Sequence, residues 1–172
     1  SNLKSLIKFS KLKKSPIIIK MIISNNSKAK GLQYSKIYKI KKKVFNFNNA
    51  SSEKKIINEL KKNKIDLICL AGFMKILSKS FIKNFRGKIL NIHPSLLPKY
   101  KGLNTHHKAI KNKDKYSGCT VHFVNSKLDS GKIVNQKKVR IKKIDTPKSL
   151  AKRIKIQEHK LYPAAIKKIF SL

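Results

Sequence analysis

The sequence predicts an α/β fold: an open, doubly wound and mostly parallel sheet, with an antiparallel strand pair toward the C-terminus. From residue 51 to residue 93, helix-like and strand-like segments alternate, which is typical of a parallel sheet with helices on both faces. The segment 66–70 is almost continuously apolar, as expected of a strand covered on both sides. Residues 118–124 and 132–141 are two strand-like runs joined by a short connection, and they predict the antiparallel pair.

The N-terminal part of the chain predicts one helix and two strands. Apolar residues at helical spacing favour a helix over residues 1–14, which Pro16 ends. The run 17–24 is rich in β-branched residues and is followed by a polar turn, so it predicts a strand. A basic connection then leads to a second, shorter strand over residues 44–47.

The middle of the chain predicts two helices and two strands. Segment 51–53 contains serines and a glutamate, which cap helix N-termini, and the apolar residues after it recur at helical spacing. After the strand 66–70, we expect a helix over residues 74–85 and then a strand over residues 88–93.

The last predicted helix carries a carboxylate on its inward face. Thr146 followed by Pro147 predicts the helix start. An inward stripe at helical spacing follows, made up of Leu150, Ile154, Glu158, Leu161 and Ala165. Because an unpaired buried charge is costly, Glu158 requires either a ligand or a partner, and an ion pair with a nearby lysine is the structural alternative.

The chain is strongly basic, with 43 Lys and Arg against 7 Asp and Glu, a formal net charge of +36. Such a charge by itself points to nucleic acid or an anionic membrane. However, only Arg86, Arg140 and Arg153 are arginines, the residue on which base-reading proteins rely, and lysines occur in almost every segment. We interpret the lysine excess as compositional drift of the genome and expect no dedicated nucleic-acid partner.

Cysteine usage and hydropathy favour a cytoplasmic protein. Cys69 and Cys119 are isolated within strand-like runs, so we expect buried free thiols in a reducing compartment. No apolar run approaches the ~18 residues of a membrane span, and no signal peptide follows the first lysines. No Cys/His cluster has metal-ligand spacing, so we expect no metal. The sequence leaves the oligomeric state open.

Two polar residues stand out at the end of the strand 88–93. Residues two apart in a strand point to the same face, so Asn91 and His93 present an amide and an imidazole side by side. They do so at the carboxyl end of the strand, where open α/β sheets bind ligands. Taken alone, the pair has a structural reading as well, a hydrogen-bonded histidine beside a turn asparagine.

Five motifs in a fixed order carry a resemblance to a known family. They are LAGFMKIL at 70–77, LNIHPSLLPKY at 90–100, GCTVHFV at 118–124, LDSG at 128–131 and QEH at 157–159. Together they resemble the glycinamide ribonucleotide formyltransferases of purine biosynthesis, and the resemblance covers almost the whole chain. It implies a Rossmann-like formyltransferase fold and small-molecule substrates, with 10-formyltetrahydrofolate as co-substrate.

The resemblance also implies a catalytic group. Asn91 would bind the formyl oxygen, and His93, held protonated by Asp129, would stabilise the oxyanion of a tetrahedral intermediate. The formyl group would pass directly to the amine of 5-phosphoribosylglycinamide, with water relaying the proton.

Binding residues follow from the same resemblance. Glu158 would meet the glycinamide end of the substrate, and Ser1 and Asn2 its phosphate. The folate pocket would be lined by Met74, Lys75, Ile76, Leu77, Asn91, Val124, Asn125 and Leu128. Without the resemblance, the apolar members of this set would be ordinary core residues.

The family's first strand and its glycines are absent before Ser1, so we expect a single, N-terminally truncated formyltransferase domain over residues 1–172. Two alternatives remain open. One is another folate enzyme, namely methionyl-tRNA formyltransferase or formyltetrahydrofolate deformylase. The other is a non-catalytic basic binding protein derived from a decayed enzyme.

Overall fold

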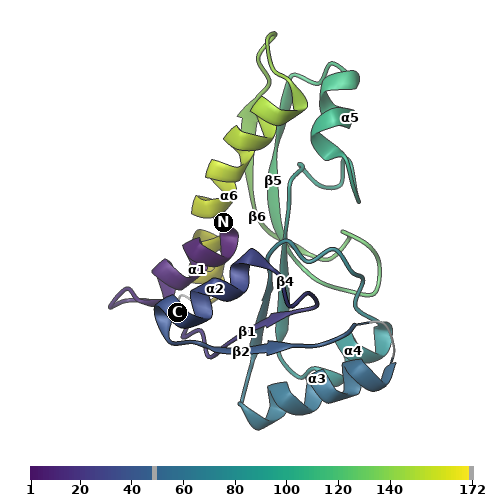
Figure 1. Cartoon of the computed structure of the whole chain (residues 1–172). Helices are drawn as coiled ribbons and strands as arrows, with labels where there is room; N and C mark the ends of the chain where they lie inside the picture. Colours follow the sequence, from purple (N-terminus) through teal and green to yellow (C-terminus); the bar gives the residue numbers. More distant parts are fainter. Residues whose placement is uncertain (48–49, 171–172) are drawn as a thin grey trace.

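The computed structural model describes residues 1–47 and 50–170 (Figure 1). Helices and strands alternate along most of the chain, and the longest helix closes it. In order, the elements are α1 (Asn2–Ser10), β1 (Met21–Ser24), the 3-10 helix η1 (Lys30–Leu32), α2 (Gln33–Tyr38), β2 (Lys41–Val44), α3 (Ala50–Lys62), β3 (Leu67–Leu70), α4 (Lys79–Asn84), β4 (Lys88–His93), α5 (Thr105–Lys111), β5 (Tyr116–Phe123), β6 (Ile133–Arg140) and α6 (Pro147–Phe170).

The strands form two sheets. β1 and β2 pair in parallel, and the second sheet has the order β3-β4-β5-β6. In that sheet β3 and β4 are parallel, whereas β5 runs antiparallel to both β4 and β6. The predicted α/β class, with parallel strands followed by an antiparallel pair, is confirmed. Among the described residues no strand pairs with the second edge of β1 or of β3, so the parallel part is interrupted between them.

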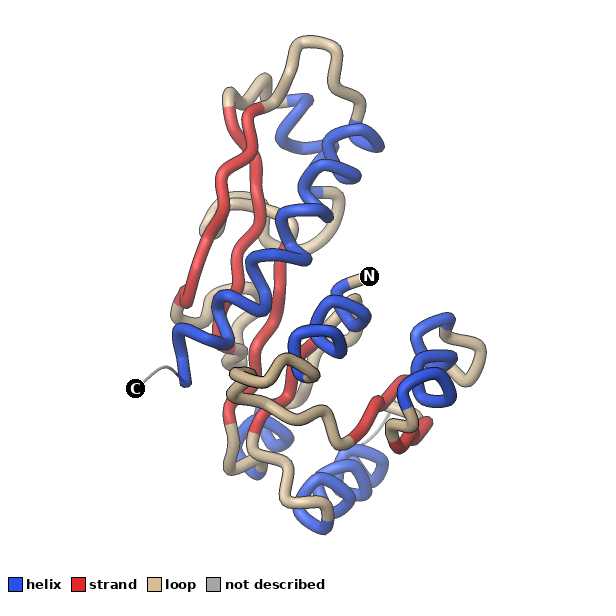
Figure 2. Tube along the Cα trace, turned by 90° about the vertical axis from the view of Figure 1, so that its left-hand side faces the viewer, coloured by secondary structure: helices blue, strands red, loops and turns tan. Residues whose placement is uncertain are grey.

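Helices cover both faces of the parallel strands β3 and β4, as a doubly wound fold requires. Leu67 and Cys69 of β3 pack into an apolar cluster with α6 and α1. Ile68 and Leu70, which alternate with them, pack into a second cluster with α3 and α4. Figure 2 shows α6 running along the strands of this sheet, with which it is in contact. The next strand, β4, is held in the same way, because Leu90 packs into the first cluster and Ile89 into the second.

The inward stripe of the last helix is confirmed. Leu150, Ile154 and Ala165 are fully buried, and Glu158 is only 9% exposed. The predicted start is also confirmed, because Pro147 is the first residue of α6 and the Thr146 hydroxyl accepts a hydrogen bond from the Ser149 backbone N–H. This helix thus carries a carboxylate into the interior at a fixed position.

The helix predicted over residues 74–85 is wrong at its N-terminal end, because α4 begins only at Lys79. Ser78 caps it by accepting from the Phe81 N–H, and Glu53 accepts from the Ser78 N–H. Glu53, which was expected to cap its own helix, therefore stabilises the start of a different one. The residues before Ser78 stay irregular.

The two N-terminal strands are shorter than predicted or shifted. Only Met21–Ser24 of the predicted 17–24 strand pairs, although Ile17 and Ile19 pack against the core. The predicted 44–47 strand lies instead at Lys41–Val44, a segment of three lysines and one valine. Its position follows from its pairing with β1, Met21 opposite Lys41, and not from its own apolar pattern.

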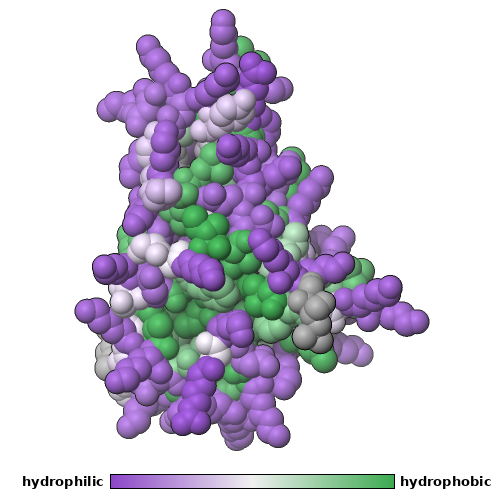
Figure 3. Space-filling view, turned by 180° about the vertical axis from the view of Figure 1, so that it is seen from behind, coloured by the Kyte–Doolittle hydropathy of each residue, from purple (hydrophilic) through white to green (hydrophobic). Residues whose placement is uncertain are grey.

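The basic residues are widely distributed. On the face seen in Figure 3, hydrophilic side chains project from the top, the bottom and both sides of the molecule, around a central apolar area. Cys69 and Cys119 are free thiols, and burial raises the pKa of each to about 12, so both stay protonated. Across the described ranges, none of the helices combines the length and the apolar character needed to cross a bilayer.

Tyr162 joins α6 to the strands that carry the site. It is fully buried, and its hydroxyl lies 3.1 Å from the carbonyl oxygen of Leu70 and 3.0 Å from that of Leu90. Burial raises the pKa of Tyr162 well above its usual value, so the hydroxyl keeps the proton that it donates.

Replacing Tyr162 by Phe should therefore lower the free energy of unfolding by ~1–2 kcal/mol, because the one hydroxyl hydrogen that the two buried carbonyl groups share is lost. Urea unfolding measures this change. As a control, Tyr116→Phe alters a side chain that is 44% exposed, and we expect a change within about 0.5 kcal/mol. Equal effects of the two substitutions would contradict the bridging role.

Candidate active site

A cavity of about 600 Å³ lies where β3 and β4 end. Leu70 is the last residue of β3 and His93 the last of β4, and both line the cavity. Every binding or catalytic residue predicted from the sequence also lines it, with the exception of Ser1. These residues are Asn2, Met74, Lys75, Ile76, Leu77, Asn91, His93, Val124, Asn125, Leu128, Asp129 and Glu158. Its volume is within the range of small-molecule sites.

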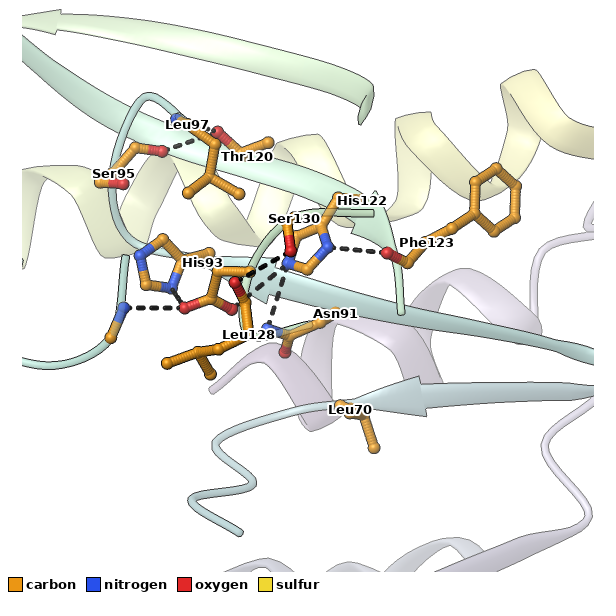
Figure 4. A network of polar contacts seen from close by, with 12 residues as sticks. Leu70, Asn91, His93, Ser95, Leu97, Thr120, His122, Phe123, Leu128 and Ser130 are labelled. Carbon is orange, nitrogen blue, oxygen red and sulfur yellow. Dashed lines mark hydrogen bonds and ion pairs between the residues drawn. The ribbon is translucent and has the colours of Figure 1, made fainter. Parts of the chain in front are cut away.

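Asn91 and His93 meet a third polar side chain from the neighbouring strand. In the antiparallel register between β4 and β5, Asn91 lies opposite His122. The Asn91 amide nitrogen is 3.4 Å from Nε2 of His122 (Figure 4). Cross-strand partners project to the same face of a sheet, so all three side chains face the same side.

Asp129 reaches this group from the loop between β5 and β6. Its Oδ2 lies 3.3 Å from Nδ1 of His93, and its Oδ1 lies 3.6 Å from Nε2 of His122. The backbone N–H of Gly102 donates to Oδ2 at 2.9 Å. Asp129 has a positive φ of 44°, a conformation that Asp tolerates better than most residues. A buried carboxylate is thus surrounded by three donors or potential donors.

The surroundings of His93 suit a doubly protonated ring. Nδ1 faces the Asp129 carboxylate, and Nε2 lies 2.8 Å from the carbonyl oxygen of Tyr100. Neither of these partners can donate a hydrogen bond in its ionised or backbone form. Only the imidazolium form donates from both nitrogens, so it alone satisfies both acceptors.

Glu158 has a neutral partner. The side-chain amide of Asn2 donates to Oε2 of Glu158 at 2.8 Å, which joins α1 to α6 at the cavity wall. The contact is thus with an amide, where an ion pair with a lysine was the alternative. Burial raises the pKa of Glu158, while the hydrogen bond from Asn2 opposes that shift.

Ser1 lies outside the cavity. Its hydroxyl accepts from the Lys4 backbone N–H at 3.3 Å and so caps α1. Ser1 lines a separate pocket of about 330 Å³ together with Lys4, Ser5, Lys8 and His159. Of the two residues expected to meet the substrate phosphate, the structure brings only Asn2 to the cavity.

Sequence reasoning assigned no role to two histidines at the site. His122 stands in the motif at 118–124 and His106 follows Thr105, but neither showed a local pattern that set it apart. His106 lines the cavity, its Nδ1 is buried without a hydrogen-bond partner, and burial lowers its pKa. The cross-strand register, which a single sequence does not reveal, is the signal that would have identified His122.

Comparison with known proteins defines the class. Residues 1–166 match the family model described as formyl transferase, and the chain belongs to that family. It is 47% identical to phosphoribosylglycinamide formyltransferase of Haemophilus influenzae over 156 residues, covering 88% of this chain and 74% of that protein. The resemblance inferred from the sequence motifs is confirmed.

Two further relatives extend this comparison. The crystal structure of phosphoribosylglycinamide formyltransferase from Brucella melitensis matches with a TM-score of 0.93 and 39% identity, over 99% of this chain and 90% of that one. The human trifunctional purine biosynthetic protein adenosine-3 is 41% identical over an alignment of 175 residues. That alignment covers 99% of this chain but 17% of the human protein, so the chain spans about a sixth of it.

The raised pKa of Glu158 implies that the stability of the protein depends on pH. Between its unfolded and folded pKa values the folded state binds more protons, so the stability linked to Glu158 is present at acid pH and is lost as the pH rises through the folded value. The stability of Glu158→Gln relative to the wild type should therefore increase from pH 4 to pH 8, measured by urea unfolding.

Glu59 supplies the control of opposite sign. A hydrogen bond from Lys41 lowers the pKa of Glu59, so its contribution is present at neutral pH and is lost as the pH falls through the folded value. Relative to the wild type, Glu59→Gln should lose stability at neutral pH and regain it in acid. The same pH trend for both variants would show that general charge, and not burial, governs Glu158.

Proposed function

We propose that this protein transfers the formyl group of 10-formyltetrahydrofolate to the amine of 5-phosphoribosylglycinamide, a step of purine biosynthesis. The grouping of Asn91, His93 and Asp129 at the end of β4 carries this proposal, because it supplies donors and a counter-charge beside a cavity of suitable size. The relatives named phosphoribosylglycinamide formyltransferase support the choice of substrate.

The proposed reaction is a direct acyl transfer. The amine attacks the formyl carbon, a new C–N bond forms, and the formyl oxygen becomes an oxyanion in a tetrahedral intermediate. The bond from that carbon to the folate nitrogen then breaks. The amine loses one proton and the folate nitrogen gains one, with water as the relay.

Asn91 and His93 would stabilise the oxyanion. An amide nitrogen carries two N–H groups, and that of Asn91 uses one toward His122, so the other can donate to the formyl oxygen. The Nε2–H of His93 donates to the Tyr100 carbonyl, so in this mechanism the oxyanion would share that N–H with the carbonyl while Nδ1 stays against Asp129. Asp129 balances the imidazolium charge throughout.

The remaining lining residues would divide between the two substrates. Met74 and Ile76 are 73% and 71% exposed at the cavity, an unusual state for large apolar side chains, which a bound pterin would cover. Lys75, Leu77, Val124, Asn125 and Leu128 complete the folate side. Glu158 and Asn2 belong to the ribonucleotide side in this proposal, with Glu158 toward the amine.

We also propose that the reaction needs no metal, that the protein acts in the cytoplasm and that it has no dedicated nucleic-acid partner. The free cysteines support a reducing compartment. The scarcity of arginine among the basic residues argues against base recognition.

Purified protein incubated with 10-formyltetrahydrofolate and 5-phosphoribosylglycinamide should yield formylated ribonucleotide and tetrahydrofolate in equal amounts. Omitting the ribonucleotide, or replacing it with methionyl-tRNA, should abolish folate turnover and so separate the alternative enzymes. EDTA should leave the rate unchanged. Turnover with tRNA, with water alone, or with no acceptor at all would overturn the proposal, and zinc-dependent activity would overturn its metal-free form.

His93→Ala and Asp129→Asn should each lower kcat by ~10²–10⁴-fold, because both residues act on charge that appears during transfer. The folate Kd, measured by calorimetry, should change much less than kcat. Asp66→Asn is the matched control, since Asp66 precedes β3 at the end away from the cavity. If folate affinity fell as steeply as turnover, His93 and Asp129 would be binding residues.

A further inference from the structure

His122 is a buried polar side chain of the site to which the proposed reaction assigns no role. It is 2% exposed, and it contacts the Phe123 carbonyl oxygen and the Asn91 amide (Figure 4). Its third contact is with the Asp129 carboxylate. His122 lies between Asn91, the proposed oxyanion donor, and Asp129, the proposed counter-charge. Its protonation state therefore affects the hydrogen bonding of both residues.

The contact with Phe123 determines the tautomer. Nδ1 of His122 lies 2.8 Å from the Phe123 carbonyl oxygen, which can only accept, so Nδ1 carries a hydrogen. A neutral ring then has its lone pair on Nε2. That nitrogen lies 3.4 Å from the Asn91 amide nitrogen and 3.6 Å from Oδ1 of Asp129. The lone pair can accept from the amide, whereas the carboxylate offers it no hydrogen.

Resting on the proposed function, we infer that neutral His122 is a positioning residue, which holds the Asn91 amide with its nitrogen toward β5 and its second N–H free for the formyl oxygen. An amide without such an acceptor can rotate by half a turn and present its carbonyl oxygen to the site instead. That orientation would repel a developing oxyanion. His122 thus determines which end of Asn91 the substrate meets.

The Phe123 carbonyl that sets the tautomer is itself held in place. A Cβ on Gly131 would lie 1.7 Å from this oxygen, so the loop returning to β6 passes against it at a distance that only glycine allows. The Phe123 N–H donates to the Lys132 carbonyl at 2.9 Å. The same loop carries Asp129, so one segment fixes both the tautomer of His122 and the partner of His93.

Protonation of His122 would reverse its effect. Nε2 would then donate, either to Asp129 or to the carbonyl oxygen of a rotated Asn91 amide, and the Asn91 N–H would lose its acceptor. Burial lowers the pKa of His122, and the nearby His93 acts in the same direction. The Asp129 charge and the Phe123 carbonyl act in the opposite direction. The neutral, accepting form is therefore favoured at neutral pH, and acid should remove it.

Two substitutions separate positioning from simple packing. His122→Leu keeps an apolar volume but accepts nothing, whereas His122→Gln retains an acceptor and does not titrate. We expect His122→Leu to lower kcat by about 10- to 100-fold, less than the roughly 10²–10³-fold effect of losing an oxyanion donor outright. Its folate Kd should stay within about threefold. His122→Gln should recover most of kcat and lose the acid limb that His122 adds to the pH profile.

His107→Gln is the control, because His107 is exposed on α5 and should leave both kcat and the pH profile unchanged. Nitrogen NMR of the wild-type protein at pH 7 tests the tautomer without any turnover, and it should report the Nδ1–H form of His122. An imidazolium or an Nε2–H form would overturn the inference whatever the activity.

The kinetic outcomes distinguish this inference from the proposed function. If the wild type forms the formylated ribonucleotide but His122→Leu matches it, or if His122→Gln falls as far as His122→Leu, positioning is wrong while the function stands. If the wild type fails to formylate the ribonucleotide under all conditions, the proposed function is wrong, and the role of His122 in it is wrong as well.

Discussion

The site depends on the burial of one carboxylate, that of Asp129. An ion removed from water is stable only where hydrogen bonds and opposite charge replace its hydration. The fold meets this demand with the His93 ring and the Gly102 backbone N–H. Two backbone features bring the loop to this point: Asp129 adopts a left-handed conformation, and the backbone at Gly131 packs closely against the Phe123 carbonyl. The orientation of His93 follows from the position of that carboxylate, whereas the Phe123 carbonyl, held by the same loop, orients His122 and through it Asn91.

The two faces of the sheet have different roles: one packs against α6, and the other leaves room for a cavity at the strand ends. One face is sealed by α6, whose stripe of buried residues continues into Tyr162 and its contacts to β3 and β4. The other face is sealed by α3 and α4 only as far as Leu70, and beyond that point the irregular segment before Ser78 leaves a cavity. Ligand sites lie at the carboxyl ends of such strands because the helices cover the strands themselves, whereas the connecting loops can diverge. Glu158, which belongs to the inward stripe of α6, lines this cavity.

The few acidic residues keep specific structural contacts in spite of the strongly basic composition. The sequence has seven, and six of them make specific contacts: Glu53, Glu59, Asp114, Asp129, Asp145 and Glu158. These contacts cap a helix, pair with a side chain or line the cavity. Lysines, in contrast, occupy exposed positions on nearly every element, where the fold would accept any hydrophilic residue. This contrast supports drift as the source of the charge, because a surface selected for one polyanion would gather its lysines in one region.

The sequence by itself determined whatever depends on neighbours along the chain. The strand Lys88–His93 was predicted to the residue, and the stripe on α6 and the shared face of Asn91 and His93 were also predicted, because periodicity records which side of an element is buried. The tertiary structure alone decided which elements meet and in what register. It placed His122 opposite Asn91, moved the second strand to the lysines of β2, and used Glu53 to cap α4. These outcomes depend on pairing between distant segments, and local propensity carries no information about a partner that lies far away in the chain.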